Sequence, residues 1–177
     1  MRLAAALPLI AGLALAACQA DDKPKTEDQV RGEAAKLAKP VPGQYRSTSK
    51  LISFEVPGMS TEQSERIKQM FASNMQGRTY CLTEAEADKG FEEAMKKLPQ
   101  GKCSYDRFSV SGNYLEAQLS CETGKDMKGV IGLKGTVSET GSQITMSVEQ
   151  GAPGMEGNKL KVVAEVASER TGDCAGG

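Results

Sequence analysis

The second half of the chain alternates apolar and polar residues, and this alternation restricts the fold more than any other feature. Residues 115–121 read Leu-Glu-Ala-Gln-Leu-Ser-Cys. Successive side chains of a β-strand point to opposite faces, so a period of two predicts a strand with one apolar face and one polar face. The same alternation recurs in three later stretches, at residues 131–137, 144–148 and 160–166.

Turn residues between these stretches predict two β-hairpins. A two-residue loop at 112–113 would place Val110 opposite Leu115. A turn at 140–141 would place Gly135 opposite Met146. In both hairpins the apolar side chains of the two strands then share one face. We therefore expect an antiparallel meander that is packed on one face and solvated on the other.

The first half of the chain predicts helices inserted between strands. Residues 52–56 alternate as a strand, and residues 78–82 form a second, shorter one. Capping boxes at Ser60 with Gln63 and at Thr83 with Glu86 begin two helices. The expected fold class is α+β, mainly an antiparallel β meander forming a curved sheet or a partly open barrel, with two helices in the N-terminal half.

The N-terminus has the layout of an export signal. Arg2 precedes an apolar stretch over residues 3–15, which is shorter than the roughly 20 residues that a membrane-spanning helix needs. Leu15-Ala16-Ala17-Cys18 resembles the lipobox of bacterial lipoproteins, which implies cleavage after residue 17 and lipidation of Cys18. In the sorting rule of that class, Gln19 favours the outer membrane, with the protein facing the periplasm.

The predicted mature chain has a polar beginning and one domain. Residues 18–40 are rich in charged side chains, and we expect a lipidated cysteine followed by a flexible polar spacer. The alternative is a short helix over residues 27–39 with Val30, Ala34 and Leu37 on one side. Residues 41–177 are expected to form a single disulfide-linked, β-rich domain.

The cysteine count supports this assignment. Five cysteines are an odd number, and giving Cys18 to the lipid leaves Cys81, Cys103, Cys121 and Cys174. By strand parity Cys103 and Cys121 lie on opposite faces, which disfavours a bond between them. We expect Cys81–Cys103 and Cys121–Cys174. The alternative is Cys81–Cys121 with Cys103–Cys174.

Composition excludes several functions. The chain has no histidine and no tryptophan, and its formal net charge is −1. Histidine is the commonest general base and transition-metal ligand, so we expect no enzyme, no metal and no cofactor. A chain without excess positive charge or stacking aromatics is not expected to bind nucleic acid.

Two tripeptides are weak candidates for a ligand site. Pro57-Gly58-Met59 and Pro153-Gly154-Met155 are copies of one sequence. Their methionines, Met59 and Met155, would offer an adaptable surface to a hydrophobic ligand. The plainer interpretation is two ordinary turns, each with a methionine that fills a gap.

Three segments carry short sequence motifs: residues 42–59 begin Pro-Gly-Gln-Tyr, residues 79–87 contain Cys-Leu-Thr, and residues 169–174 end Gly-Asp-Cys. In these segments the chain resembles the domain of unknown function 3617 family of small proteobacterial exported proteins. The family usually has tryptophan where this chain has Tyr45. The resemblance implies a cell-envelope location and paired cysteines, and no activity. We expect a non-catalytic module that binds a small apolar ligand or an envelope component, or alternatively a structural lipoprotein that contacts another envelope protein without an internal pocket.

Overall fold

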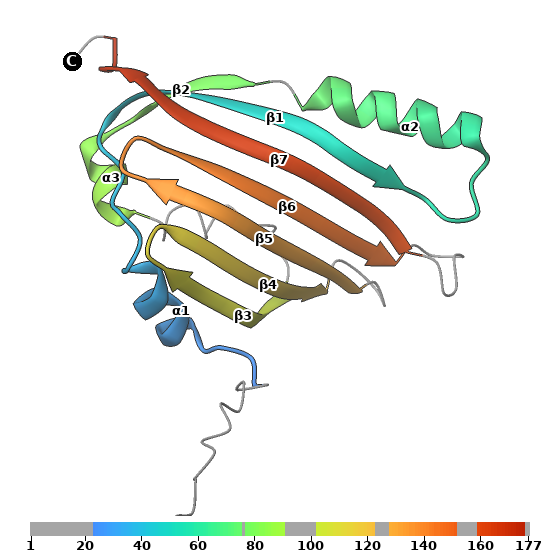
Figure 1. Ribbon diagram of the computed structural model, residues 1–177, viewed down its shortest axis with the longest axis horizontal. Coiled ribbons are helices and arrows are strands. Elements are labelled where there is room, and N and C mark those ends of the chain that lie inside the picture. The colour runs from blue at the N-terminus through green and yellow to red at the C-terminus, as the bar shows by residue number, and fades with distance from the viewer. Residues whose placement is uncertain (1–22, 76, 91–101, 123–127, 152–158, 176–177) are drawn as a thin grey trace, which may run out of the picture.

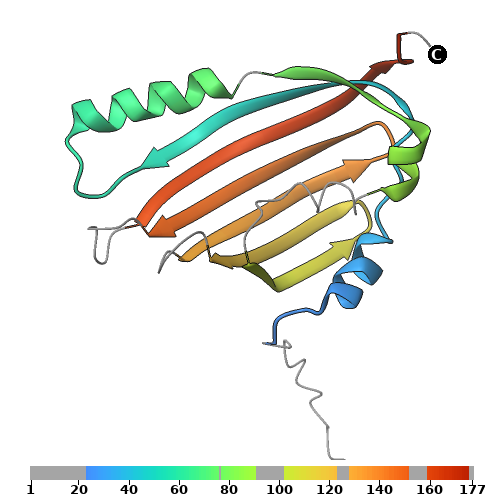
Figure 2. The same ribbon diagram turned by 180° about the vertical axis from the view of Figure 1, so that it is seen from behind.

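The computed structural model describes residues 23–75, 77–90, 102–122, 128–151 and 159–175 (Figures 1 and 2). Within these residues seven antiparallel strands form one open sheet, in the order β2-β1-β7-β6-β5-β4-β3. The strands are β1 Gly43–Glu55, β2 Arg78–Leu82, β3 Lys102–Ser111, β4 Tyr114–Glu122, β5 Lys128–Ser138, β6 Gly141–Gly151 and β7 Lys159–Gly172. The helices are α1 Glu27–Ala34, α2 Thr61–Asn74 and α3 Glu84–Lys89. The expected α+β class with a curved antiparallel sheet is confirmed.

Side-chain caps explain where the helices begin. Ser60 with Gln63 caps α2, and Thr83 with Glu86 caps α3, as predicted. A third box caps α1, where the Thr26 hydroxyl accepts from the backbone N–H of Gln29 at 3.3 Å. Each box supplies acceptors for backbone donors that the first helical turn leaves without partners. The predicted continuation of the helix after Thr83 over residues 91–98 lies outside the described residues.

The spacer prediction is wrong for α1 and the residues after it. Val30, Ala34 and Leu37 are buried and belong to the same core cluster as Phe108 of β3. These are the three residues of the helical alternative. Val30 and Ala34 lie four residues apart on one face of α1, and Leu37 follows just after the helix ends, so a segment with few apolar residues still buries all three.

The same segment also covers the free edge of the sheet at β3. The backbone N–H of Lys25 donates to the carbonyl oxygen of Tyr105 at 2.6 Å. The Glu33 carboxylate accepts from the backbone N–H of Val110 at 3.2 Å. An edge strand exposes backbone groups that invite pairing with another chain, and these two contacts occupy part of that edge.

The first predicted hairpin is confirmed, and the second has the wrong register. Val110 lies opposite Leu115, as predicted. Gly135 lies opposite Ile144 rather than Met146, because the turn is at 139–140 instead of 140–141. A slip of two residues leaves every side chain on its predicted face. Tertiary hydrogen bonds hold this turn, since the carbonyl oxygen of Glu139 accepts from the backbone N–H of Val41 at 2.8 Å.

All four predicted cysteines form disulfides, but both predicted pairings and their alternative are wrong. The bonds are Cys81–Cys174 and Cys103–Cys121, with Cα–Cα distances of 5.5 Å and 4.0 Å. The parity argument failed because the register of β3 on β4 shifts between Tyr105 and Arg107. One extra residue in β3 moves Cys103 to the face that Cys121 occupies.

The extra residue is Asp106, and its side chain stabilises the bulge. Its carboxylate accepts from the Ser120 hydroxyl at 2.6 Å and from the Gln118 amide at 3.3 Å. Both partners belong to β4. The side chain of Asp106 therefore holds the bulge to β4, although its backbone has no partner in that strand. The bulge therefore determines which cysteines can meet.

Candidate ligand-binding face of the open sheet

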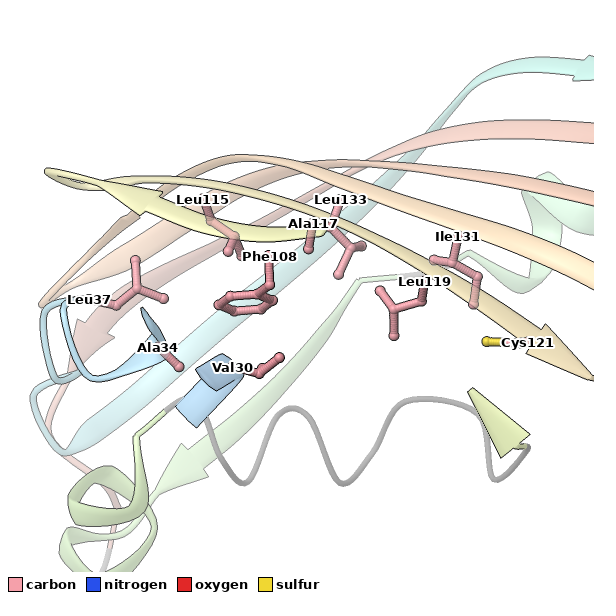
Figure 3. Packing of buried hydrophobic residues seen from close by; sticks show 10 residues of the cluster. All are labelled: Val30, Ala34, Leu37, Phe108, Leu115, Ala117, Leu119, Cys121, Ile131 and Leu133. Carbon is pink, nitrogen blue, oxygen red and sulfur yellow. The ribbon is translucent and has the colours of Figure 1, made fainter. Parts of the chain in front are cut away.

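One face of the sheet is apolar, and half of it is a closed core. The buried side chains come from β3, β4 and β5, and α1 packs over them (Figure 3). They are Phe108, Leu115, Ala117, Leu119, Cys121, Ile131 and Leu133. The alternation in the sequence places these residues on one face, because each is separated from the next on its strand by an outward residue.

The apolar face continues beyond the core across β6, β7 and β1. Met146 lies opposite Leu133 on one side and Ala164 on the other, and Ala164 lies opposite Leu51. We call this part of the face the apolar strip. Its half-buried members are Ile144, Met146, Val148, Leu160, Val162, Val166, Leu51 and Phe54.

The strip keeps access to solvent because α1 and α2 contact strands near opposite edges of the sheet. Helix α1 packs on β3, and α2 packs on β1 (Figure 1). Between them the strip side chains are only partly buried, unlike the core under α1. A ligand that covers these apolar side chains removes them from water, and this burial stabilises the complex.

Helix α2 borders the strip where β2 ends. β2 pairs with residues 43–47 of β1, and α2 lies beside the remainder of that strand. The rings of Phe54 and Phe71 are 5.5 Å apart between centroids and tilted. Met70 on α2 is 56% exposed, and Ile52 on β1 is 53% exposed. The helix is therefore attached to the sheet with part of its apolar surface still in water.

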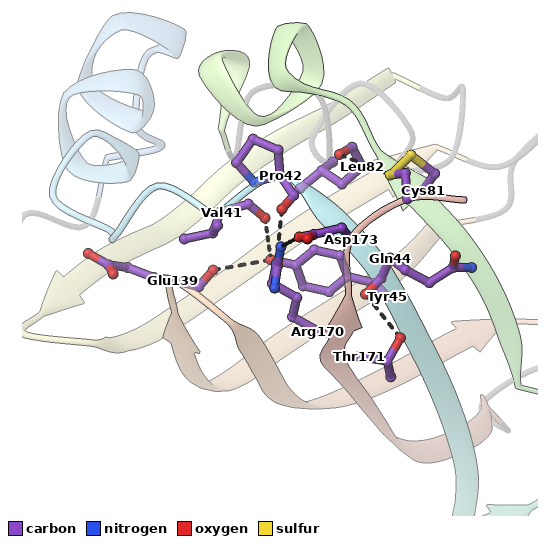
Figure 4. Close-up of polar contacts among 11 residues, drawn as sticks. Val41, Pro42, Gln44, Tyr45, Cys81, Leu82, Glu139, Arg170, Thr171 and Asp173 are labelled. Carbon is purple, nitrogen blue, oxygen red and sulfur yellow. Dashed lines mark hydrogen bonds and ion pairs between the residues drawn. A yellow bond between two sulfur atoms is a disulfide. The ribbon is translucent and has the colours of Figure 1, made fainter. Parts of the chain in front are cut away.

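At the other end of β1, a buried tyrosine ties three segments together (Figure 4). Tyr45 is 3% exposed. Its hydroxyl lies 2.8 Å from the carbonyl oxygen of Val41 and 3.1 Å from that of Glu139, so one proton is shared between two acceptors. Its ring stacks on Tyr80 at 5.7 Å. Burial raises the pKa of Tyr45, and the neighbouring Tyr80 adds to this shift.

Arg170 completes this junction. Its Nε donates to the carbonyl oxygen of Pro42 at 2.9 Å, and its terminal nitrogen pairs with Asp173. The Cys81–Cys174 disulfide closes the same end. The segments beginning Pro42, Cys81 and Gly172 lie far apart in the sequence, yet they meet here. The contacts of Tyr45 and Arg170 and the disulfide give these three segments a structural role.

The opposite face of the sheet is polar and carries a charge network centred on Glu116. Glu116 lies 3.1 Å from Arg107 and 3.2 Å from Lys134, on the two neighbouring strands. The hydrogen bond from Lys134, and then that from Arg107, lowers the pKa of the Glu116 carboxyl. The network orients these side chains, and because it is exposed we assign it little stability.

The structure describes one of the two methionines predicted to bind a ligand. Met59 is half-buried in the turn after β1, where its backbone N–H donates to the carbonyl oxygen of Val56 at 3.3 Å. Met155 lies outside the described residues, and so does Cys18. Within the described ranges, no group of three or more metal-ligating side chains is placed to hold an ion. No helix among the described residues is long and apolar enough to cross a membrane.

Sequence reasoning missed α1 as a cover for this face. The signal was present in the chain, since Thr26 and Gln29 have the spacing of a capping box just before Val30. The strip itself was visible as alternation. Its partial exposure was not, because exposure depends on where the helices pack.

Fold and site define an open antiparallel sheet with a half-covered apolar face and two disulfides. Residues 40–174 match the family model described as protein of unknown function (DUF3617), and the chain belongs to that family. No curated protein and no solved structure matches the chain.

Proposed function

We propose that this chain is a cell-envelope lipoprotein that binds a small apolar ligand on the apolar strip, without catalysis. The observation that carries the proposal is the strip itself, which continues the core across three strands while staying in contact with solvent. Removal of apolar surface from water stabilises a complex by about 25 cal/mol per Å². A ligand with an acyl chain or a flat apolar body would fit a surface of this shape.

The envelope location is supported by the leader and the disulfides. Cys18 follows a lipobox-like sequence at the end of an apolar leader. Two disulfides favour an oxidising compartment such as the periplasm. A lipid with two or more chains on Cys18 would hold the domain stably at a membrane, and Gln19 favours the outer membrane.

A matched pair of substitutions on β7 tests the strip. Val162 lies opposite Val148 on the strip, whereas its neighbour Val163 lies opposite Ser147 on the polar face, and both are half-buried. Val162→Thr puts a hydroxyl into the contact, at a cost of about 1–3 kcal/mol, so an apolar probe should bind roughly fivefold to a hundredfold more weakly. Val163→Thr should leave binding unchanged.

The probe is the fluorescent dye N-phenyl-1-naphthylamine, titrated into the purified protein. Enhanced emission that Val162→Thr weakens and Val163→Thr does not supports the strip. Equal effects of the two variants, or no binding by either variant or the parent, contradict it. Native mass spectrometry of the protein from its own envelope would then identify the natural ligand by mass.

The second candidate is a structural lipoprotein that contacts another envelope protein. The exposure of Ile52 on β1 and of Met70 on α2 favours it, because these two elements are in contact and exposed apolar surface can mark a contact site. A stoichiometric protein partner in the native mass spectrum, with no small molecule, would favour this function over the first.

A further inference from the structure

The polar face of the sheet has a shallow hollow that the proposed function does not use. Its volume is about 460 Å³, within the ~300–1,000 Å³ range of small-molecule sites. It crosses four strands, from β4 to β7. The side chains that matter here are Tyr114, Lys134, Thr136, Gln143, Thr145 and Glu165.

A glycine on β5 leaves room for the hollow. Gly132 lies opposite Ser147 and contributes no side chain to this face. A Cβ atom at Gly132 would lie 2.5 Å from the Ser147 hydroxyl oxygen, closer than real contacts allow. Any larger residue would therefore displace Ser147 or fill part of the hollow itself.

Three polar side chains of the hollow are unpaired among the described residues, and a fourth, Lys134, is paired with Glu116. Thr136, Gln143 and Thr145 have no side-chain hydrogen-bond partner within the described part of the chain. Lys134 is held by Glu116 at 3.2 Å, which positions its ammonium beside the groove. With the Glu165 carboxylate included, the hollow offers amide, hydroxyl, cationic and anionic groups to a ligand.

An exposed aromatic ring stands at one end. Tyr114 is 42% exposed, and among the described residues its ring contacts no other ring. It lies opposite Thr136, so ring and hydroxyl face the groove together. A flat ring beside a row of donors and acceptors matches a pyranose, which has an apolar C–H face and a rim of hydroxyls.

We propose that this hollow binds a neutral oligosaccharide. Neutral ligands are favoured because the one lysine is paired with Glu116 and a carboxylate of Glu165 lines the same groove, so an anion gains no net attraction. An apolar ligand is disfavoured because binding would cover hydroxyl and amide groups without replacing their water contacts. The sugar ring would stack on Tyr114, and Gln143 would hydrogen-bond to its hydroxyls.

The test is a titration of the protein with chitotriose and maltotriose, followed by backbone amide chemical shifts. Shift changes should gather at the amides of Tyr114, Thr136 and Thr145. Tyr114→Ala and Gln143→Leu should each weaken binding by roughly tenfold, whereas Tyr114→Phe should retain it because the ring remains. The control is Tyr80→Ala, which removes a tyrosine of similar exposure, 39%, on the opposite face and should not change sugar binding.

Three results would overturn the proposal: no shift changes with either sugar, shift changes on the apolar face, or equal loss from Tyr114→Ala and Tyr80→Ala. Circular dichroism of each variant confirms that it is folded. Should Tyr114→Ala not fold, Gln143→Leu carries the same test. The dye that reports on the apolar strip should bind Tyr114→Ala as it binds the parent, so the two proposals fail separately.

Discussion

The two disulfides close loops of very different length, and this difference predicts how much each stabilises the domain. Cys81–Cys174 joins residues 93 apart, and Cys103–Cys121 joins residues 18 apart. In the loop-closure model these bonds restrict the unfolded chain by about 4.6 and about 3.2 kcal/mol, respectively. The longer loop should therefore contribute about 1.4 kcal/mol more.

Reduction of a single remaining bond measures its contribution without removing the two sulfur atoms that form it. The Cys103→Ala/Cys121→Ala variant keeps only Cys81–Cys174, and the Cys81→Ala/Cys174→Ala variant keeps only Cys103–Cys121. Urea unfolding with and without dithiothreitol gives the loss of unfolding free energy for the remaining bond. The first variant should lose more.

A larger loss in the second variant would refute the loop-closure reasoning for this fold. Peptide mapping without reductant provides an independent check. Any peptide that joins Cys81 to Cys103 or Cys121 would instead refute the register of β3 on β4, because that register brings Cys103 and Cys121 together.

Three single substitutions test other parts of the structure. Tyr45→Phe removes a hydroxyl that shares one proton between two carbonyl oxygens, so the urea-measured unfolding free energy should fall by about 1 kcal/mol. Because the folded-state pKa of Tyr45 is raised, that difference should persist below pH ~10 and shrink as pH rises further; a constant difference up to pH ~11 would contradict it. Gly135→Ala would place a Cβ atom 1.9 Å from the Gln143 carbonyl oxygen, so thermal unfolding should show a loss of about 1–3 kcal/mol, and an unchanged midpoint would contradict the β5–β6 register. Val30→Ala should cost about 1–3 kcal/mol and speed amide exchange in α1, whereas unchanged exchange would contradict the packing of α1 on β3.

The faces of the strands could be predicted from the sequence, and their register could not be predicted everywhere. Alternation assigns a side chain to a face, and a slip of two residues leaves that assignment intact, as at Gly135 and Ile144. A bulge of one residue reverses it. Asp106 is an ordinary polar residue in the sequence, and only its bonds to β4 reveal that the strand count changes there.

The candidate site was predictable to the same extent. The apolar strip follows from alternation in β6 and β7, including Met146 and Val162. Which part of that face is covered depends on helices whose docking is decided by long-range contacts, such as that between Phe71 and Phe54. The hollow beside Tyr114 gave no sequence signal, because its lining is drawn from four strands and each contributes one to four residues.

The docking of α1 against β3 also limits how far the domain can travel. The backbone of Lys25 is hydrogen-bonded to Tyr105 in β3, so with the lipid at Cys18, as proposed, the chain between the two would be seven Cα–Cα steps long. A fully extended chain of that length reaches about 25 Å at most. The β3 edge of the sheet would thus stay within that distance of the bilayer surface. With that tether, cargo or partners would have to come to the membrane, because the domain could not move farther from it.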